Sequence, residues 1–117
     1  RVLAEATAKT ITGMLESAVR VNNVAVISGY RVAGKTGTAY IPDFVKGGYS
    51  DEFIHTFIGY APASDPKFVI LVKLERPALG ETAGVTVVPA FRELAQYVLN
   101  YYRIPPDNVP VAPAKIP

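Results

Sequence analysis

Residues 32–39, Val-Ala-Gly-Lys-Thr-Gly-Thr-Ala, combine strand-forming side chains with two glycines. They belong to a β-branched and aromatic run between Asn23 and Pro42, which predicts strands. A glycine inside a strand leaves no side chain to pack and costs more conformational entropy on folding than other residues. Gly34 and Gly37 therefore indicate a place where another backbone comes close.

Lys35, Thr36, Gly37 and Thr38 form the candidate binding site in this stretch. The edge of a strand can accept an extended peptide through main-chain hydrogen bonds. An ammonium on Lys35 and hydroxyls on Thr36 and Thr38 would bind a carboxylate, and Gly37 would leave the edge free of side chain. The alternative is a strand with a glycine bulge and a solvated lysine.

The letters of residues 29–36, Gly-Tyr-Arg-Val-Ala-Gly-Lys-Thr, also satisfy the phosphate-binding pattern G-x-x-x-x-G-K-[ST]. A phosphate loop needs a compact turn that enters a helix whose N-terminal amides face the anion. Bulky residues fill the turn positions here, and Gly37 and Pro42 oppose a helix afterwards. This context argues against a P-loop nucleotide-binding protein, which is the alternative from another function class.

The sequence on either side of this stretch predicts one helix and a hairpin. Apolar residues recur at steps of three and four over Ala4–Val19, which predicts an amphipathic helix. His55–Ala61 and Phe68–Glu75 predict two antiparallel strands around a proline-rich turn. Glycines and charges between Pro42 and Glu52 predict a loop.

A second amphipathic helix is predicted from Val88 to Tyr102, with Pro89 tolerated because it falls in the first turn. A loop is predicted over Gly80–Gly84. We expect the helix to cover one face of the sheet. The order of elements therefore predicts an α+β fold, an antiparallel sheet with helices packed on it.

The composition excludes several classes of protein. A chain of 117 residues, 50% hydrophobic and 19% charged, fits one small domain. A net charge of +2 is too small to indicate a nucleic-acid partner. The absence of cysteine and the single histidine exclude a disulfide framework and thiolate or histidine metal sites. We expect neither a metal nor another cofactor.

The Lys-Thr-Gly within residues 32–39 resembles the third active-site motif of penicillin-binding proteins and serine β-lactamases. Residues 55–67, His-Thr-Phe-Ile-Gly-Tyr-Ala-Pro-Ala-Ser-Asp-Pro-Lys, resemble the next strand and turn of the monofunctional, class B penicillin-binding proteins. Residues 68–77 and the helix near Pro89 are similar as well. The resemblance runs from about residue 8 to residue 108, in the same order of elements. It implies the C-terminal part of a transpeptidase domain.

The resemblance implies a peptidoglycan D,D-transpeptidase, which cross-links stem peptides ending in D-Ala-D-Ala through a serine acyl-enzyme and is acylated by β-lactams. Lys35 would bind the carboxylate of peptide or antibiotic and assist proton movement, and the hydroxyls of Thr36 and Thr38 would bind the same carboxylate. Gly37 would leave space, and the Thr38 N–H would donate in the oxyanion hole, so Lys35 and Thr38 are the catalytic candidates. The alternatives are a D,D-carboxypeptidase or serine β-lactamase of the same fold, or a non-catalytic interaction module.

The nucleophile of this family, the serine of S-x-x-K, is not recognisable in the chain. Residues 64–67, Ser-Asp-Pro-Lys, match its letters but fall in the predicted hairpin turn. No S-x-N motif occurs either. We therefore expect both motifs upstream of Arg1, with residues 1–104 forming the C-terminal part of an incomplete transpeptidase domain and residues 105–117 forming a proline-rich tail.

The resemblance also implies partners and a location. The partners are the upstream part of the same domain, the stem peptide, β-lactams and cell-division or elongation proteins. The location is the bacterial inner membrane, with the catalytic domain on the periplasmic side and the anchor outside this segment. Two helices on a few strands would leave one sheet face and an edge uncovered, so we expect the upstream part to pack there.

Other aromatic residues have structural interpretations. The single imidazole, His55, is expected in a structural or surface role. Tyr97, Tyr101 and Tyr102 are expected to cover the core with their hydroxyls outward. The loop Ile41–Glu52 could gate access to the strand of the candidate site, and the alternative is a solvated connection.

Overall fold

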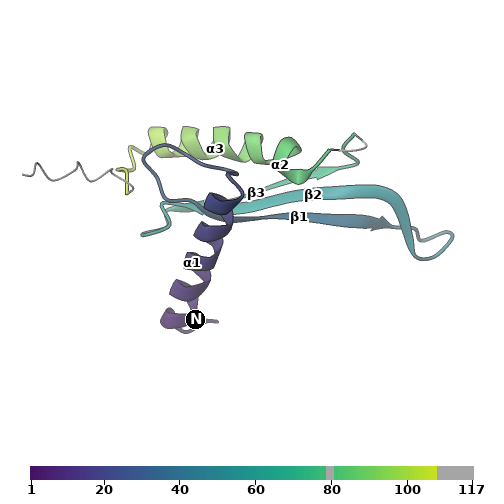
Figure 1. Cartoon of the computed structure of the whole chain (residues 1–117), viewed down its shortest axis with the longest axis horizontal. Coiled ribbons are helices and arrows are strands. Elements are labelled where there is room, and N and C mark those ends of the chain that lie inside the picture. The colour runs from purple at the N-terminus through teal and green to yellow at the C-terminus, as the bar shows by residue number, and fades with distance from the viewer. Residues whose placement is uncertain (79–80, 108–117) are drawn as a thin grey trace, which may run out of the picture.

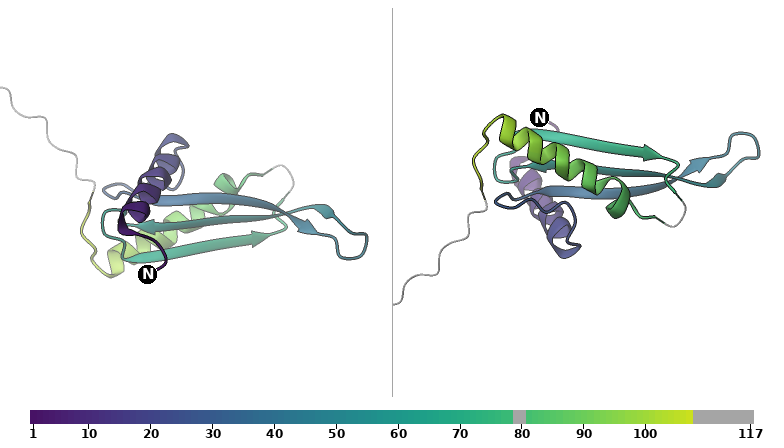
Figure 2. Two further views of the ribbon diagram at one scale, coloured as in Figure 1. Left: turned by 90° about the horizontal axis from the view of Figure 1, so that it is seen from below. Right: turned by 90° about the horizontal axis from the view of Figure 1, so that it is seen from above.

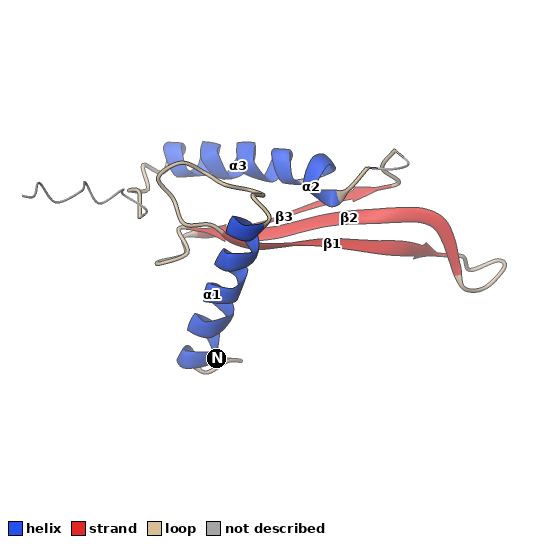
Figure 3. Ribbon diagram, in the orientation of Figure 1, coloured by secondary structure: helices blue, strands red, loops and turns tan. Residues whose placement is uncertain are grey.

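The computed structural model describes residues 1–78 and 81–107. Its elements are α1 (Glu5–Val21), β1 (Ala33–Pro42), β2 (Tyr49–Ala61), β3 (Phe68–Glu75), α2 (Ala83–Thr86) and α3 (Val88–Tyr101). The strands form one antiparallel sheet in the order β1-β2-β3, so β1 is an edge strand (Figure 1 and Figure 3). This architecture confirms the predicted α+β fold, the hairpin and the second helix.

The core lies between the sheet and α3, which runs along one face of it (Figure 2). The rings of Phe57 on β2 and Phe91 on α3 are 4.6 Å apart, and neither side chain is exposed. Gly34 makes room for this pair, because a Cβ there would lie 2.5 Å from Phe57 Cζ and 2.9 Å from the Ile58 carbonyl oxygen. The close approach predicted at Gly34 is confirmed.

Helix α1 projects away from the opposite face of the sheet (Figure 1). It touches that face where the hydroxyls of Thr12 and Tyr60 lie 2.8 Å apart. Val19 is its one buried residue, whereas Met14 is 66% exposed. The apolar stripe that predicted this helix is therefore only partly covered.

The sheet face on the side of α1 is also open. Ile58 on β2 and Val69 and Leu71 on β3 are 48%, 63% and 60% exposed, which is unusual for adjacent apolar side chains on a sheet. The expectation of an uncovered face and a free β1 edge is confirmed for the part of the chain that the structure describes.

Four predictions about elements were wrong. The loop predicted between Pro42 and Glu52 is shorter, since β2 begins at Tyr49. No strand precedes Ala33: the chain after α1 has positive φ angles at Asn23 (49°) and Ala25 (54°), and it turns at Gly29 (φ 83°), where Ile27 and Tyr30 form a single bridge. The end of the predicted loop Gly80–Gly84 is helical, since α2 begins at Ala83. The helix tyrosines do not cover the core: Tyr97, Tyr101 and Tyr102 are 64%, 66% and 69% exposed.

The start of β1 is tied to distant segments by a carboxylate. Asp107 accepts hydrogen bonds from the Arg31 N–H at 2.7 Å, the Ser64 N–H at 3.3 Å and the Ser64 hydroxyl. The Ala63 N–H also donates to the Arg31 carbonyl oxygen at 2.7 Å. The segment after α3 thereby fixes the β2–β3 turn against the entry to β1. Most of the predicted tail lies outside the described residues.

Candidate functional site

The backbone of β2 faces β3 at every second residue. The Phe53 carbonyl oxygen accepts from the Arg76 N–H at 2.9 Å, and the Ala61 carbonyl oxygen accepts from the Lys67 N–H at 3.2 Å. Both donors flank β3, and both acceptors are odd-numbered. Since neighbouring residues of a strand direct their backbone groups to opposite sides, the odd-numbered residues of β2 face β3 and the even-numbered ones face β1.

This alternation fixes which backbone groups of β1 are free. Thr56 is even-numbered and lies opposite Gly37, so the backbone of Gly37 pairs with β2. The backbone groups of its neighbours Thr36 and Thr38 then point away from β2, to the open edge. The Thr38 N–H is thus a donor aimed out of the sheet.

The side chains of the candidate site lie on both faces of β1. Thr36 lies opposite Phe57, which faces α3, so the hydroxyls of Thr36 and Thr38 are on the helix-covered face. Lys35 lies on the other face, but its ammonium folds around the edge and donates to the Thr36 carbonyl oxygen at 2.9 Å. Ammonium, amide and hydroxyls therefore meet along one strand edge.

Gly37 has a different role from the one its sequence position suggested. A Cβ at Gly37 would lie 2.4 Å from Thr56 Oγ1, well inside contact distance. The space left by the missing side chain is taken by the hydroxyl of the next strand, on the face away from α3. Gly37 keeps β1 close to β2, and it does not line the cavity described next.

A cavity of about 430 Å³ runs along the open edge of β1. Lys35, Thr36 and Thr38 line it from the strand. Its other walls are the end of α1 with the residues after it, and the start of α2: Ala18, Asn22, Val24, Thr82, Ala83 and Gly84. The sequence prediction missed the α2 wall, because no local pattern indicates which loop folds against a strand edge.

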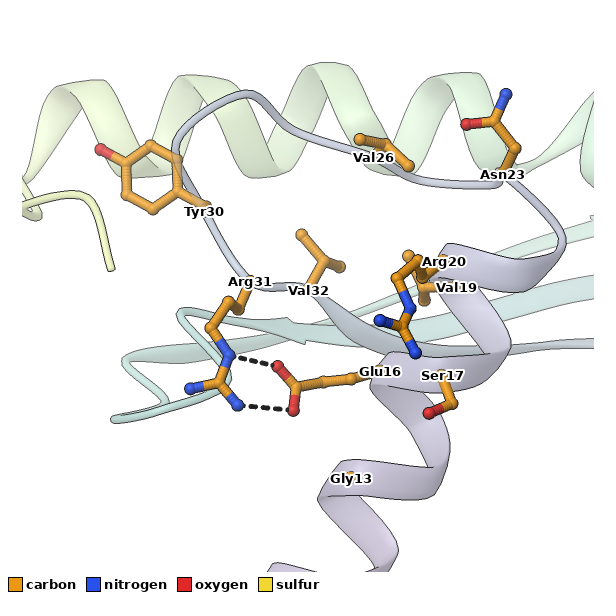
Figure 4. Close-up of a pocket in the computed structure, with 10 residues that line it drawn as sticks. All are labelled: Gly13, Glu16, Ser17, Val19, Arg20, Asn23, Val26, Tyr30, Arg31 and Val32. Carbon is orange, nitrogen blue, oxygen red and sulfur yellow. Dashed lines mark hydrogen bonds and ion pairs between the residues drawn. The ribbon is translucent and has the colours of Figure 1, made fainter. Parts of the chain in front are cut away.

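A second cavity, of about 510 Å³, lies between α1 and the chain that leads into β1 (Figure 4). Its Arg31 donates to both oxygens of Glu16, at 2.7 and 2.8 Å. This hydrogen bond and the charge of Glu16 raise the pKa of Arg31. Because the pair neutralises itself, and no residue of Lys35–Thr38 lines the space, this cavity is not the site.

Two motif matches are not supported by the geometry. Lys35 and Thr36 lie within β1 rather than at the start of a helix, so the P-loop alternative is wrong. Ser64 lies in the turn after β2, its hydroxyl donates to Asp107, and Lys67 pairs with Asp65. Ser64 and Lys67 therefore do not form a serine–lysine pair, which agrees with the sequence interpretation.

Three further observations complete the description of the site. In the described ranges, no group of three or more His, Cys, Asp or Glu side chains could hold a metal. No described helix combines the length and hydrophobicity needed to cross a bilayer. His55, expected in a structural or surface role, is only 2% exposed and its Nδ1 lies 2.9 Å from Thr86 Oγ1, so it is an interior residue and not a surface one.

Comparisons with known proteins extend this picture. The chain is 35% identical to penicillin-binding protein PbpB of Mycolicibacterium smegmatis over 94% of its own length and 19% of that protein. It is 37% identical to the probable peptidoglycan D,D-transpeptidase PbpC of Pseudomonas aeruginosa, covering 92% of the chain and 20% of that protein. It thus spans about a fifth of these curated relatives.

The structural comparison agrees with the sequence comparison. The crystal structure of penicillin-binding protein 3 from Mycobacterium tuberculosis, complexed with ampicillin, superposes with a TM-score of 0.80 at 31% identity. The match covers 97% of this chain and 28% of that one. The family model of the penicillin-binding protein transpeptidase domain matches residues 1–96. With its Lys-Thr-Gly-Thr edge strand and these matches, the chain belongs to the penicillin-binding protein transpeptidase family.

Proposed function

We propose that this chain forms the substrate-aligning part of a peptidoglycan D,D-transpeptidase. The observation that supports this most is the open edge of β1, where the Thr38 N–H points outward beside the ammonium of Lys35 and the hydroxyls of Thr36 and Thr38. An extended peptide laid along this edge would pair with the backbone of Thr36 and Thr38. The cavity of about 430 Å³ gives such a peptide room.

The geometry suits acyl transfer from a peptide that ends in a carboxylate. Lys35 and the hydroxyls of Thr36 and Thr38 bind the terminal D-Ala carboxylate, which orients the preceding carbonyl toward the Thr38 N–H. A serine hydroxyl attacks that carbonyl carbon, and its proton passes to the nitrogen of the departing D-Ala as the C–N bond breaks. The negative charge on the carbonyl oxygen during attack is stabilised by the Thr38 N–H.

The second half of the reaction frees the serine. An amine from a neighbouring stem peptide attacks the ester carbon, forms the new amide and returns a proton to the serine oxygen. A β-lactam enters the first half only: the serine oxygen bonds to the ring carbonyl carbon, the ring C–N bond breaks, and the nitrogen takes the serine proton. That nitrogen remains tethered through the other ring atoms, so it does not leave. The crystal structure of the relative in complex with ampicillin supports β-lactam binding by the complete protein.

The nucleophile belongs, in this proposal, to an upstream part of the same domain that packs against this chain. Two surfaces support such a partner: the open sheet face around Ile58, Val69 and Leu71, and the partly exposed stripe of α1. Burying these apolar side chains would stabilise both parts. Residues 1–104 then form the C-terminal part of the domain. The substrate places the domain on the periplasmic side of the inner membrane, where division or elongation proteins are further partners.

The test is labelling of the complete protein with a fluorescent penicillin. We expect Lys35→Ala to slow acylation at least about 100-fold, because it removes the charge that binds the carboxylate and assists proton movement. Lys67→Ala is the control. The Lys67 ammonium pairs with Asp65 in an exposed turn, so this variant should be acylated at the normal rate. Normal acylation of Lys35→Ala would refute the site.

The acceptor is tested by analysing the products. We expect cross-linked dimer from stem peptides supplied with an acceptor amine. Trimmed peptide without dimer would instead indicate a D,D-carboxypeptidase. The isolated 117-residue chain should not be labelled, and covalent labelling of that chain would show that the nucleophile lies within it.

A further inference from the structure

His55 lies next to the candidate site without lining its cavity. In the register of the sheet it is directly opposite Thr38, on the same helix-covered face. Because the backbone of His55 faces β3, the two residues form a non-hydrogen-bonded pair, the kind in which side chains lie closest. The imidazole is 2% exposed. A buried polar ring therefore supports the face of β1 that carries the Thr38 hydroxyl.

The imidazole is connected to the other wall of the cavity. Its Nδ1 is 2.9 Å from Thr86 Oγ1, and the Thr86 hydroxyl donates to the Thr82 carbonyl oxygen at 3.2 Å. A hydroxyl has one proton to donate, so Thr86 accepts from an Nδ1–H of His55. Thr82 is a wall residue of the cavity, and so are Ala83 and Gly84 after it. One chain of hydrogen bonds thus joins the sheet beside Thr38 to the α2 wall.

Among the described residues, the side-chain hydrogen bonds of the α2 wall are those of Thr86. Helix α2 has only four residues, and no side chain caps its N-terminus at Thr82. Of its residues, Ala83 is buried, whereas Val85 is 64% exposed. A helix this short has little stability of its own. The His55–Thr86 hydrogen bond therefore adds a polar restraint on the separation between α2 and β1 to the burial of Ala83 and the continuity of α2 with α3 through the buried Val87.

We propose that His55 and Thr86 are a positioning pair for the acylation step, holding the α2 wall at a fixed distance from Thr36 and Thr38. The pair touches neither substrate nor nucleophile. It keeps the cavity at a width in which a bound carboxylate meets the hydroxyls of β1, and a misplacement of about 1 Å in such a site can cost up to about 100-fold in rate. This inference rests on the proposed function.

The first test uses variants of Thr86 in the complete protein. Thr86→Val keeps the shape and removes the hydroxyl, and Thr86→Ser keeps the hydroxyl. We expect the second-order acylation rate with fluorescent penicillin to fall about 10- to 100-fold in Thr86→Val and to be restored to within about threefold in Thr86→Ser. Val85→Ala, an exposed change in the same helix, is the control. Acylation of Thr86→Val within twofold of wild type would overturn the proposal.

The second test separates positioning from general destabilisation. At position 55, the amide donor of Asn would lie near the place of Nδ1, whereas that of Gln would lie near the place of Nε2. We therefore expect the His55→Asn protein to be acylated faster than the His55→Gln protein, although Gln is closer in volume to the imidazole. A loss of rate that follows melting temperature rather than donor position would indicate a purely structural role. Lys35→Ala is measured alongside. Normal acylation of Lys35→Ala would refute the proposed function. Normal acylation of Thr86→Val together with slow acylation of Lys35→Ala would refute this inference alone.

Discussion

Replacing Gly37 by alanine tests the packing of the edge strand against its neighbour. The added Cβ would lie 2.4 Å from Thr56 Oγ1, where a real contact needs at least 3.0 Å. Thr56 must rotate, or the strands must separate. Overpacking of this kind costs about 1–3 kcal/mol. We expect urea denaturation of the complete transpeptidase domain to show a loss of that size in the free energy of unfolding.

A double-mutant cycle tests the stated cause. Thr56→Ala removes the clashing oxygen and leaves its own Cβ 3.8 Å away, an ordinary contact. In the Thr56→Ala background, Gly37→Ala should leave the free energy of unfolding unchanged or raise it by up to about 1 kcal/mol, because alanine lowers the conformational entropy of the unfolded chain. The coupling energy, which is the difference between these two effects, should therefore be about 1–4 kcal/mol. Equal destabilisation with and without the Thr56 hydroxyl would refute the argument.

Gly34→Ala is the matched control. Its Cβ would meet Phe57 Cζ at 2.5 Å and the Ile58 carbonyl oxygen at 2.9 Å, so Thr56→Ala should not relieve it. If Thr56→Ala restored the stability of Gly34→Ala, the whole of β1 would have shifted. That result would refute the claim that each glycine makes room for a different neighbour.

Three further changes test the rest of the fold, each by urea denaturation of the complete domain. Asp107→Ala should cost about 1–3 kcal/mol, because three donors lose their acceptor, and Asp65→Ala in the exposed turn should cost far less. Phe91→Ala should cost about 3–5 kcal/mol and Tyr97→Ala about 0.5 kcal/mol or less, since the first is fully buried and the second is 64% exposed. Glu16→Gln should cost about 1 kcal/mol or less, and less still in high salt, because its partner Arg31 is half exposed. Equal costs within either of the first two pairs, or a Glu16→Gln cost that salt does not reduce, would contradict these assignments.

The sequence predicted the part of the site that lies on one strand. Two glycines in a strand-like run indicated close approach, and Gly34 and Gly37 both make room for β2 side chains. The alternation of a strand then sets which backbone groups of Thr36 and Thr38 are free. These features depend on local geometry and on pairing with the next strand along the chain, so a sequence pattern is enough to predict them.

What the sequence could not predict depends on contacts between distant segments. The run after Asn23 has strand composition, but Ala25 and Ile27 are buried in a turning segment rather than in a ladder. The link from His55 to Thr86 joins residues 31 positions apart, and the wall at Thr82 faces a strand that is still more distant in the sequence. The helix tyrosines follow the helical period but face solvent. Periodicity predicts which residues share a face of a helix, but it does not predict which face packs against the sheet.

The most direct test of the central claim is a crystal structure of the complete protein acylated by ampicillin. We predict the acyl carbonyl oxygen at about 2.7–3.1 Å from the Thr38 nitrogen, and the antibiotic carboxylate within hydrogen-bonding distance of the Lys35 ammonium or the hydroxyls of Thr36 and Thr38. An acyl group bound away from the edge of β1, or a Thr38 N–H already paired with another strand of the protein, would contradict the account.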